Sequence, residues 1–196
     1  MQSEIMLSLI ALLSLGLALG DVLKFQPSNY IPANKFGHQV RLTSFKFKNC
    51  GNKAKDLFVI GSLDIGPDPV QFPGAFTVSF SGVAKKTIDS PVPAKVVISK
   101  KQGDQYIQLP CIQGIGSCNY PDLCALLGQI GTQCPQPLIS AGIPCECPYK
   151  AGSYKLGPAS FDVGSALLPT GDYMASINMT SKAGPVGCYV IYLTLS

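Results

Sequence analysis

Apolar and polar side chains alternate along several short segments of this chain. In the clearest segment, Phe76, Val78 and Phe80 alternate with hydroxyl side chains. A period of two residues is typical of a strand that buries one face. This pattern, or a short apolar run bounded by turn residues, predicts strands over residues 44–48, 57–65, 76–80, 94–101, 105–109, 152–156, 161–163, 172–180 and 187–195.

Turn-forming residues separate these segments. Two prolines interrupt residues 66–69, and Gly103 with Asp104 predicts a tight hairpin between residues 94–101 and 105–109. Many short strands at close spacing favour an all-β fold, an antiparallel β-cup or sandwich with one short helix and a disulfide-rich loop region. Periodicity does not decide whether the interior is a packed core or a hydrophobic cavity, because the same side chains line both.

A cysteine-rich stretch, residues 109–148, holds six of the eight cysteines. It also carries the one predicted helix, which Asn119 caps and which presents Leu123, Leu126, Leu127 and Ile130 on one face. An even cysteine count favours a disulfide framework, although eight cysteines allow 105 pairings. Zinc is the weaker interpretation, because the close pair Cys145 and Cys147 has only His38 as a histidine to accompany it.

The N-terminal residues predict a secretory signal peptide. An apolar run over residues 5–17 is followed by small residues, which predicts cleavage after Gly20. An uncleaved membrane anchor is the alternative. Residues 21–43 show neither strand nor helix periodicity and predict an extended lead-in or a propeptide, which leaves residues 44–196 as one domain.

Charge is sparse and slightly basic. Hydrophobic residues make up 46% of the chain and charged residues 13%, with a net charge of +4. Without residues 1–20, 15 basic residues remain against 10 acidic ones, a net charge of +5. This basicity suits an anionic membrane surface and is too dispersed for nucleic acid. The doublets Lys85-Lys86 and Lys100-Lys101 either steer the protein to anionic lipid or solvate strand ends.

The sequence lacks the groups that catalysis needs. His38 lies in the lead-in, Glu146 is the one glutamate after residue 20, and no glycine-rich phosphate loop follows a strand. We therefore expect a protein that is not an enzyme and that uses no cofactor or metal. Asn178 begins the sequon Asn-Met-Thr, which predicts N-glycosylation in a secreted chain.

Several motifs together resemble one known family. They are residues 44–50 (SFKFKNC), 61–74 (GSLDIGPDPVQFPG), 109–127 with its C-x6-C pair, and 134–156 with CPQPL and GIPCECP. This set resembles the ganglioside GM2 activator family, lysosomal sphingolipid activators that lift a ganglioside from a membrane for a β-hexosaminidase. The resemblance implies a lipid-binding β-cup, and it implies the disulfides Cys50 with Cys188, Cys111 with Cys118, Cys124 with Cys147, and Cys134 with Cys145.

The leading hypothesis is a secreted or lysosomal protein that binds the acyl chains of glycolipid or phospholipid and contacts the membrane surface as a peripheral protein. It would extract glycolipid from membranes and present it to a β-hexosaminidase-like glycosidase. The predicted cavity wall comprises Phe76, Val78, Phe80, Val96, Ile98, Ile177 and Val190. Apolar residues predicted to contact the bilayer are Phe72, Phe161, Val163, Leu167 and Leu168. The loop over residues 164–171 could equally cap the core. The alternative function is a secreted interaction protein without lipid cargo, which a cavity below a few hundred Å³ would favour.

Overall fold

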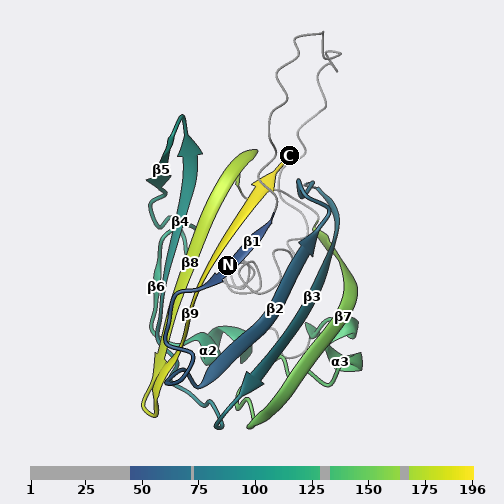
Figure 1. Ribbon diagram of the computed structural model, residues 1–196, viewed down its shortest axis with the longest axis vertical. Coiled ribbons are helices and arrows are strands. Elements are labelled where there is room, and N and C mark those ends of the chain that lie inside the picture. The colour runs from purple at the N-terminus through teal and green to yellow at the C-terminus, as the bar shows by residue number, and fades with distance from the viewer. Residues whose placement is uncertain (1–44, 72, 129–132, 164–167) are drawn as a thin grey trace.

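Two antiparallel β-sheets face each other in the computed structural model of this protein (Figure 1). The structure describes residues 45–71, 73–128, 133–163 and 168–196. The predicted signal peptide and the lead-in lie outside these residues. The strands are β1 Lys46–Asn49, β2 Phe58–Gly66, β3 Gly74–Ala84, β4 Ala94–Gln102, β5 Gln105–Gln108, β6 Asn119–Tyr120, β7 Gly152–Val163, β8 Gly171–Ser181 and β9 Gly184–Leu195.

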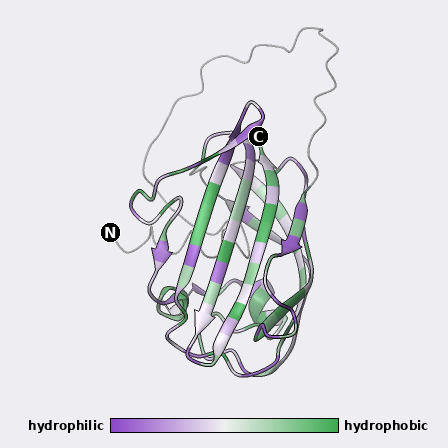
Figure 2. Cartoon of the chain, turned by 60° about the vertical axis from the view of Figure 1, so that its left-hand side comes forward, coloured by the Kyte–Doolittle hydropathy of each residue, from purple (hydrophilic) through white to green (hydrophobic). Residues whose placement is uncertain are grey.

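The larger sheet has the strand order β1-β9-β8-β4-β5, and β6 also pairs with β4. Its inner face forms from every second residue, because neighbouring strands align their apolar positions. Ile98 on β4 lies opposite Ala175 on β8, which lies opposite Ile191 on β9. All three are buried. Figure 2 shows the resulting bands of hydrophobic and hydrophilic residues along these strands.

The smaller sheet has the order β2-β3-β7. The alternating residues of β3 point inward and meet apolar partners on β7, such as Phe76 opposite Phe161 and Phe80 opposite Leu156. The pairing register shifts along this pair of strands, since Val78 lies opposite Ala159 but Phe80 lies opposite Leu156. The shift lets residues 152–156 and 161–163, predicted as two strands, form the single strand β7.

Two short helices, α2 (Leu123–Gly128) and α3 (Gln136–Ser140), lie beside one end of the sheets. Asn119 was predicted to cap the first helix, and this is wrong, because Asn119 belongs to β6 and pairs with Lys95. Asp122 takes that role, since its Oδ1 accepts the N–H of Cys124 at 2.9 Å and that of Val92 at 2.8 Å. The sequence did not predict α3, whose start is preceded by Pro135.

The structure forms four disulfides, and they join the same cysteine pairs that the family resemblance implies. They are Cys50–Cys188, Cys111–Cys118, Cys124–Cys147 and Cys134–Cys145. The first ties the end of β1 to β9 across 138 positions of sequence, and the last two tie the helices to the loop before β7. Within the described residues, neither helix has the length and hydropathy that crossing a bilayer requires.

Candidate functional site

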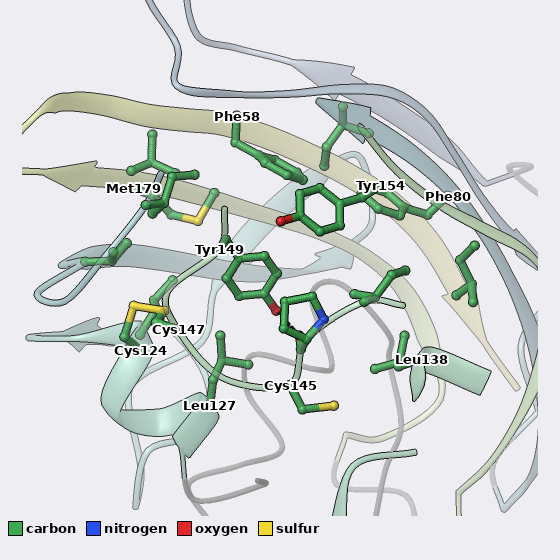
Figure 3. A pocket seen from close by; sticks show the side chains of 18 of the residues that line it. Phe58, Phe80, Cys124, Leu127, Leu138, Cys145, Cys147, Tyr149, Tyr154 and Met179 are labelled. Carbon is green, nitrogen blue, oxygen red and sulfur yellow. Dashed lines mark hydrogen bonds between the residues drawn. A yellow bond between two sulfur atoms is a disulfide. The ribbon is translucent and has the colours of Figure 1, made fainter. Parts of the chain in front are cut away.

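A cavity of about 160 Å³ lies between the two sheets at the end that the helices cover (Figure 3). Each layer of the fold contributes to its wall. Among the lining residues are Phe58 and Phe80 from the smaller sheet, Met179 and Tyr189 from the larger sheet, and Leu127 and Leu138 from the helices. None of the described residues that line this cavity is charged. The site is therefore suited to hydrocarbon.

Four aromatic rings form a continuous part of the wall. The ring of Phe58 stacks on that of Phe80 with a centroid distance of 6.0 Å and lies 6.3 Å from that of Tyr154. Tyr149 meets Tyr154 edge-on at 5.9 Å. Figure 3 shows these four rings around the space. Aromatic pairs of this geometry are rigid and bury large apolar areas, so they give the cavity a defined shape on this side.

The tyrosine hydroxyls of the wall are bonded within the protein. The hydroxyl of Tyr149 donates to the carbonyl of Pro144 at 2.7 Å, and that of Tyr154 donates to the carbonyl of Lys150 at 2.7 Å. The hydroxyl of Tyr189 donates to the carbonyl of Phe58 at 2.5 Å. Burial raises the pKa of Tyr149 and of Tyr189 to about 12, so both rings stay neutral at physiological pH. These tyrosines thus present ring carbon to the cavity.

Two disulfides hold the helical side of the wall. Cys124 and Cys147, both lining residues, join α2 to the loop before β7. Cys145 also lines the cavity and is bonded to Cys134, which precedes α3. The cysteine-rich stretch is therefore part of the binding wall as well as its support.

The predicted wall residues divide between the cavity and the packed core. Phe80 lines the cavity, and Ile177 lines a second void of about 20 Å³. The remaining inward-facing residues of the predicted wall are fully packed in the core: Phe76, Val78, Val96 and Ile98. Alternation identifies inward positions, but a cavity forms only where facing side chains leave space.

The structure corrects two placements. Val190 lies on the outer side of β9, opposite Ser176 and Lys48, because Tyr189 and Ile191 take the inward positions. Phe161 was predicted to contact the bilayer, yet it is 2% exposed and stacks on Phe76 at 5.8 Å.

The other predicted bilayer contacts lie at the edge of what the structure describes. Leu168 is partly buried against the core. Val163 ends β7 opposite Gly74, and its side chain lies outside the description. Phe72 and Leu167 lie outside the described residues. Contact of these residues with a bilayer stays a prediction.

Sequence reasoning missed most of the cavity wall. Leu156, Met179 and Tyr189 lie on predicted strands but were not chosen as wall residues. Other missed residues come from loops or from near the ends of strands, where a period of two gives no signal: Ile88, Val92, Ile143, Pro144, Tyr149 and Val186. Leu123 and Leu127 did carry a signal, since they were predicted on the apolar face of the helix. That face covers the cavity.

The predicted glycosylation site lies on strand β8. Asn178 and Thr180 of the sequon are exposed on the outer side of β8. Its glycosylation stays a prediction. The described residues contain no group of three or more potential metal ligands. His38 lies outside the described residues.

A family model and two known proteins match most of this chain. Residues 44–195 match the model of the ML domain family. The ganglioside GM2 activator of Macaca fascicularis is 36% identical over 165 residues, which cover 81% of this chain and 86% of that protein. The ganglioside GM2 activator of Mus musculus is 34% identical over 162 residues, with coverages of 79% and 83%.

Solved structures give a looser likeness. A Niemann-Pick type C2 protein from Japanese carpenter ant is 14% identical, with a TM-score of 0.41 over 77% of this chain and 99% of that chain. A TM-score this low does not support a comparison of details.

Proposed function

This chain belongs to the ML domain family, in the ganglioside GM2 activator group, and from that premise we propose that it binds lipid by enclosing acyl hydrocarbon between its two sheets. We propose further that it extracts glycolipid from membranes, leaves the head group in water and presents it to a glycosidase. The protein itself supplies no catalysis in this scheme. Its four disulfides suit the oxidising secretory route, and the proposed location is extracellular or lysosomal.

The observation that carries the proposal is a wall without a charged side chain or an unbonded tyrosine hydroxyl among the described residues. Every described lining residue is apolar, a cysteine or a tyrosine, and the three tyrosine hydroxyls bond to backbone carbonyls. A sugar or phosphate in this space would lose its hydration without gaining partners, which is costly. Hydrocarbon gains about 0.8 kcal/mol for each CH2 group removed from water. The cavity therefore selects the tail of a lipid over its head.

The size of the cavity sets a condition on this function. About 160 Å³ is smaller than the roughly 300–1,000 Å³ of most ligand pockets, and it is close to the roughly 150 Å³ that accepts a benzene-sized molecule. A cavity of this size thus accommodates only part of an acyl chain. Binding of a whole chain requires the wall to move.

Two parts of the wall are suited to that movement. Met179, a flexible side chain, lines both the main cavity and the second void, so a change of its rotamer would join the two spaces. The helix α3 has no fully buried residue, although Leu138 lines the cavity. Segments with few buried apolar contacts open at low free-energy cost. We propose that displacement of α3 lengthens the cavity for lipid.

A second function is favoured by the same volume. If the cavity does not expand, the molecule is a secreted interaction protein whose packed core contains a small void and no lipid. That candidate predicts a purified protein without lipid and no transfer activity. It differs from the first proposal in a single measurable property, the presence of hydrocarbon inside the fold.

The test combines native mass spectrometry of the purified protein with extraction of a fluorescent glycolipid from vesicles. We expect bound lipid and measurable extraction. Leu138→Trp, which fills the cavity from α3, should abolish both, whereas Ile139→Trp should not, because Ile139 is 52% exposed on the same helix. Absence of lipid in both measurements would reject the proposal in favour of the interaction protein.

Presentation to a glycosidase needs a separate experiment. Hydrolysis of a vesicle-bound glycolipid by a purified β-hexosaminidase should be faster with this protein than without it, and Leu138→Trp should remove the acceleration. Lipid extraction without acceleration would leave a lipid-transfer protein that has no hydrolase partner of this type.

A further inference from the structure

Lysines gather at one end of the molecule. Four loops meet there, residues 50–57, 84–89, 148–153 and 181–185, at the lower end of the sheets in Figure 1. The loops carry six lysines, all with exposed side chains: Lys53, Lys55, Lys85, Lys86, Lys150 and Lys182. We call this end the basic pole.

Backbone hydrogen bonds hold the four loops side by side. The N–H of Leu57 donates to the carbonyl of Pro185 at 2.9 Å, and the N–H of Lys85 donates to the carbonyl of Leu57 at 2.7 Å. Ile88 and Tyr149 exchange two such bonds of 2.8 and 2.9 Å. The lysines thus belong to one connected surface, although they lie up to 129 positions apart in sequence.

The positive charge of the basic pole is little compensated. Asp56 and Asp89 are the acidic residues of the four loops. Asp56 is 2% exposed. Six lysines against these two aspartates leave the four loops with an excess of four positive charges. Asp89 is exposed, and its Oδ1 accepts the N–H of Ser90 at 2.8 Å. A concentrated field of one sign attracts a partner of the opposite sign and raises the rate of encounter.

We infer that the basic pole docks the protein on a bilayer that contains anionic phospholipid. The basic pole follows the end of β3, whereas Val163, for which the sequence predicted bilayer contact, lies opposite the start of β3, so the basic pole replaces that contact as the docking end. The choice of a bilayer over another polyanion rests on the proposed function, because a protein that exchanges lipid has to reach a membrane. Two observations support it. Val83, which is 44% exposed, lies on the strand that leads to Lys85, so the basic pole offers hydrocarbon contact as well as charge. Tyr149, in the cavity wall, directly precedes Lys150.

This placement brings the cavity close to the membrane. Phe58, Tyr149 and Tyr154 all line the cavity, and all three lie at the ends of the loops that carry the lysines. A docked molecule would hold this aromatic side of the wall next to the lipid head groups. The basic pole is thus a docking surface at the same end as the site that takes the cargo.

The effect on binding follows from surface electrostatics. Each lysine close to an anionic membrane strengthens binding by roughly fivefold. The attraction decays within about 8 Å at physiological salt, so only lysines that face the membrane contribute. Loss of several lysines from the basic pole should therefore weaken binding strongly, and loss of lysines elsewhere should weaken it much less.

The test compares two variants of equal charge. The first carries Lys53→Gln, Lys86→Gln, Lys150→Gln and Lys182→Gln. It keeps Lys85, whose Nζ donates to the carbonyl of Ala54 at 3.2 Å and supports the loop. The control carries Lys46→Gln, Lys48→Gln, Lys100→Gln and Lys101→Gln, which lie on strands β1 and β4 and outside the four loops.

Binding is measured by sedimentation with phosphatidylcholine vesicles that contain about 30% phosphatidylserine, at about 0.1 M salt. The natural protein and the control should bind, and the pole variant should bind at least tenfold more weakly. Higher salt should weaken the binding of the natural protein. Equal loss in both variants, or equal binding to vesicles of phosphatidylcholine alone, would overturn the inference. Binding to heparin but not to vesicles would overturn it in favour of a soluble polyanion.

Uptake of a fluorescent lipid analogue from solution separates this inference from the proposed function. The pole variant should keep that uptake, because none of its substituted residues lines the cavity. Uptake without vesicle binding by the natural protein would reject the docking surface and leave the lipid-binding function in place. Vesicle binding without uptake would reject the lipid-binding function and leave the docking surface in place. Thermal unfolding checks that both variants are folded.

Discussion

The hydroxyl of Tyr189 donates a hydrogen bond of 2.5 Å to the carbonyl of Phe58, a residue 131 positions earlier in the chain. Tyr189 belongs to β9 of the larger sheet and Phe58 begins β2 of the smaller sheet. The bond therefore crosses between the two sheets, at a point where both side chains line the cavity. It fixes the distance between the sheets and removes a hydroxyl from the cavity at the same time.

Loss of this bond should destabilise the fold. Tyr189→Phe leaves the Phe58 carbonyl without its donor in a partly buried place, which costs about 1 kcal/mol. Urea unfolding should show a correspondingly lower free energy of unfolding. Tyr192→Phe is the control, because Tyr192 lies on the outer side of the same strand, where its ring contacts with Tyr106 and Lys48 do not need the hydroxyl. Equal effects of the two substitutions would contradict the role of the cross-sheet bond.

Tyr149 should make the protein sensitive to alkali. Its pKa is about 12 in the folded state against 10.0 for the free side chain, chiefly because of burial. The folded state therefore holds this proton more tightly, and the resulting stability is fully present below pH 10 and is lost as the pH rises from 10 to 12. The loss is about 1.4 kcal/mol for each pH unit in that window.

Tyr149→Phe tests this directly, because phenylalanine cannot ionise. Below pH 10 the variant should be about 1 kcal/mol less stable, through loss of the hydrogen bond to Pro144. Above pH 10 the difference should shrink and then reverse, since only the natural protein must bury a group that ionises when unfolded. Urea unfolding from about pH 8 to 12 measures it. A difference that stays constant over this range would show that Tyr149 does not titrate as described.

The four disulfides should differ in their contribution to stability. Cys50–Cys188 closes a loop of 138 positions and Cys111–Cys118 one of 7. In the chain-entropy model these closures contribute about 5 and about 2.5 kcal/mol. Paired Cys→Ser variants compared by urea unfolding should therefore show the larger loss for the first pair. The reverse order would mean that the short loop is held by the bond in the native state rather than by restriction of the unfolded chain.

The sequence predicts most of this fold, because each sheet buries one face. Alternation identified β3 by Phe76, Val78 and Phe80, and Gly103 with Asp104 marked the turn between β4 and β5. Alternation failed at β9, because the outward Val190 and Tyr192 and the inward Tyr189, Ile191 and Leu193 are all apolar or aromatic, so the strand has no polar face to mark its phase. The phase of that strand is set by its neighbours in the sheet, which a single segment does not reveal.

A hydrophobic cavity was predicted, but its position in the fold was not. A resemblance supplied the expectation of a hydrophobic cavity, and the residues expected to line it were chosen from regular strands. The observed wall instead includes Leu138 and Tyr149, whose segments are tied into the fold by the disulfides Cys134–Cys145 and Cys124–Cys147. Contacts of this kind depend on how loops pack, and short-range patterns carry no information on that packing.

Gly82 offers a direct test of the aromatic side of the cavity. A Cβ atom at this position would lie 2.9 Å from the Phe80 ring and 3.1 Å from the Phe58 ring, so Gly82→Ala has to displace rings that line the cavity. Overpacking of this kind costs about 1–3 kcal/mol. We expect lower stability in urea and weaker uptake of a fluorescent lipid analogue. The control Gly61→Ala places its Cβ 3.3 Å from the Ser81 hydroxyl, at an exposed position that does not line the cavity. Unchanged uptake by Gly82→Ala, despite a measurable loss of stability, would mean that lipid enters without contact with these rings.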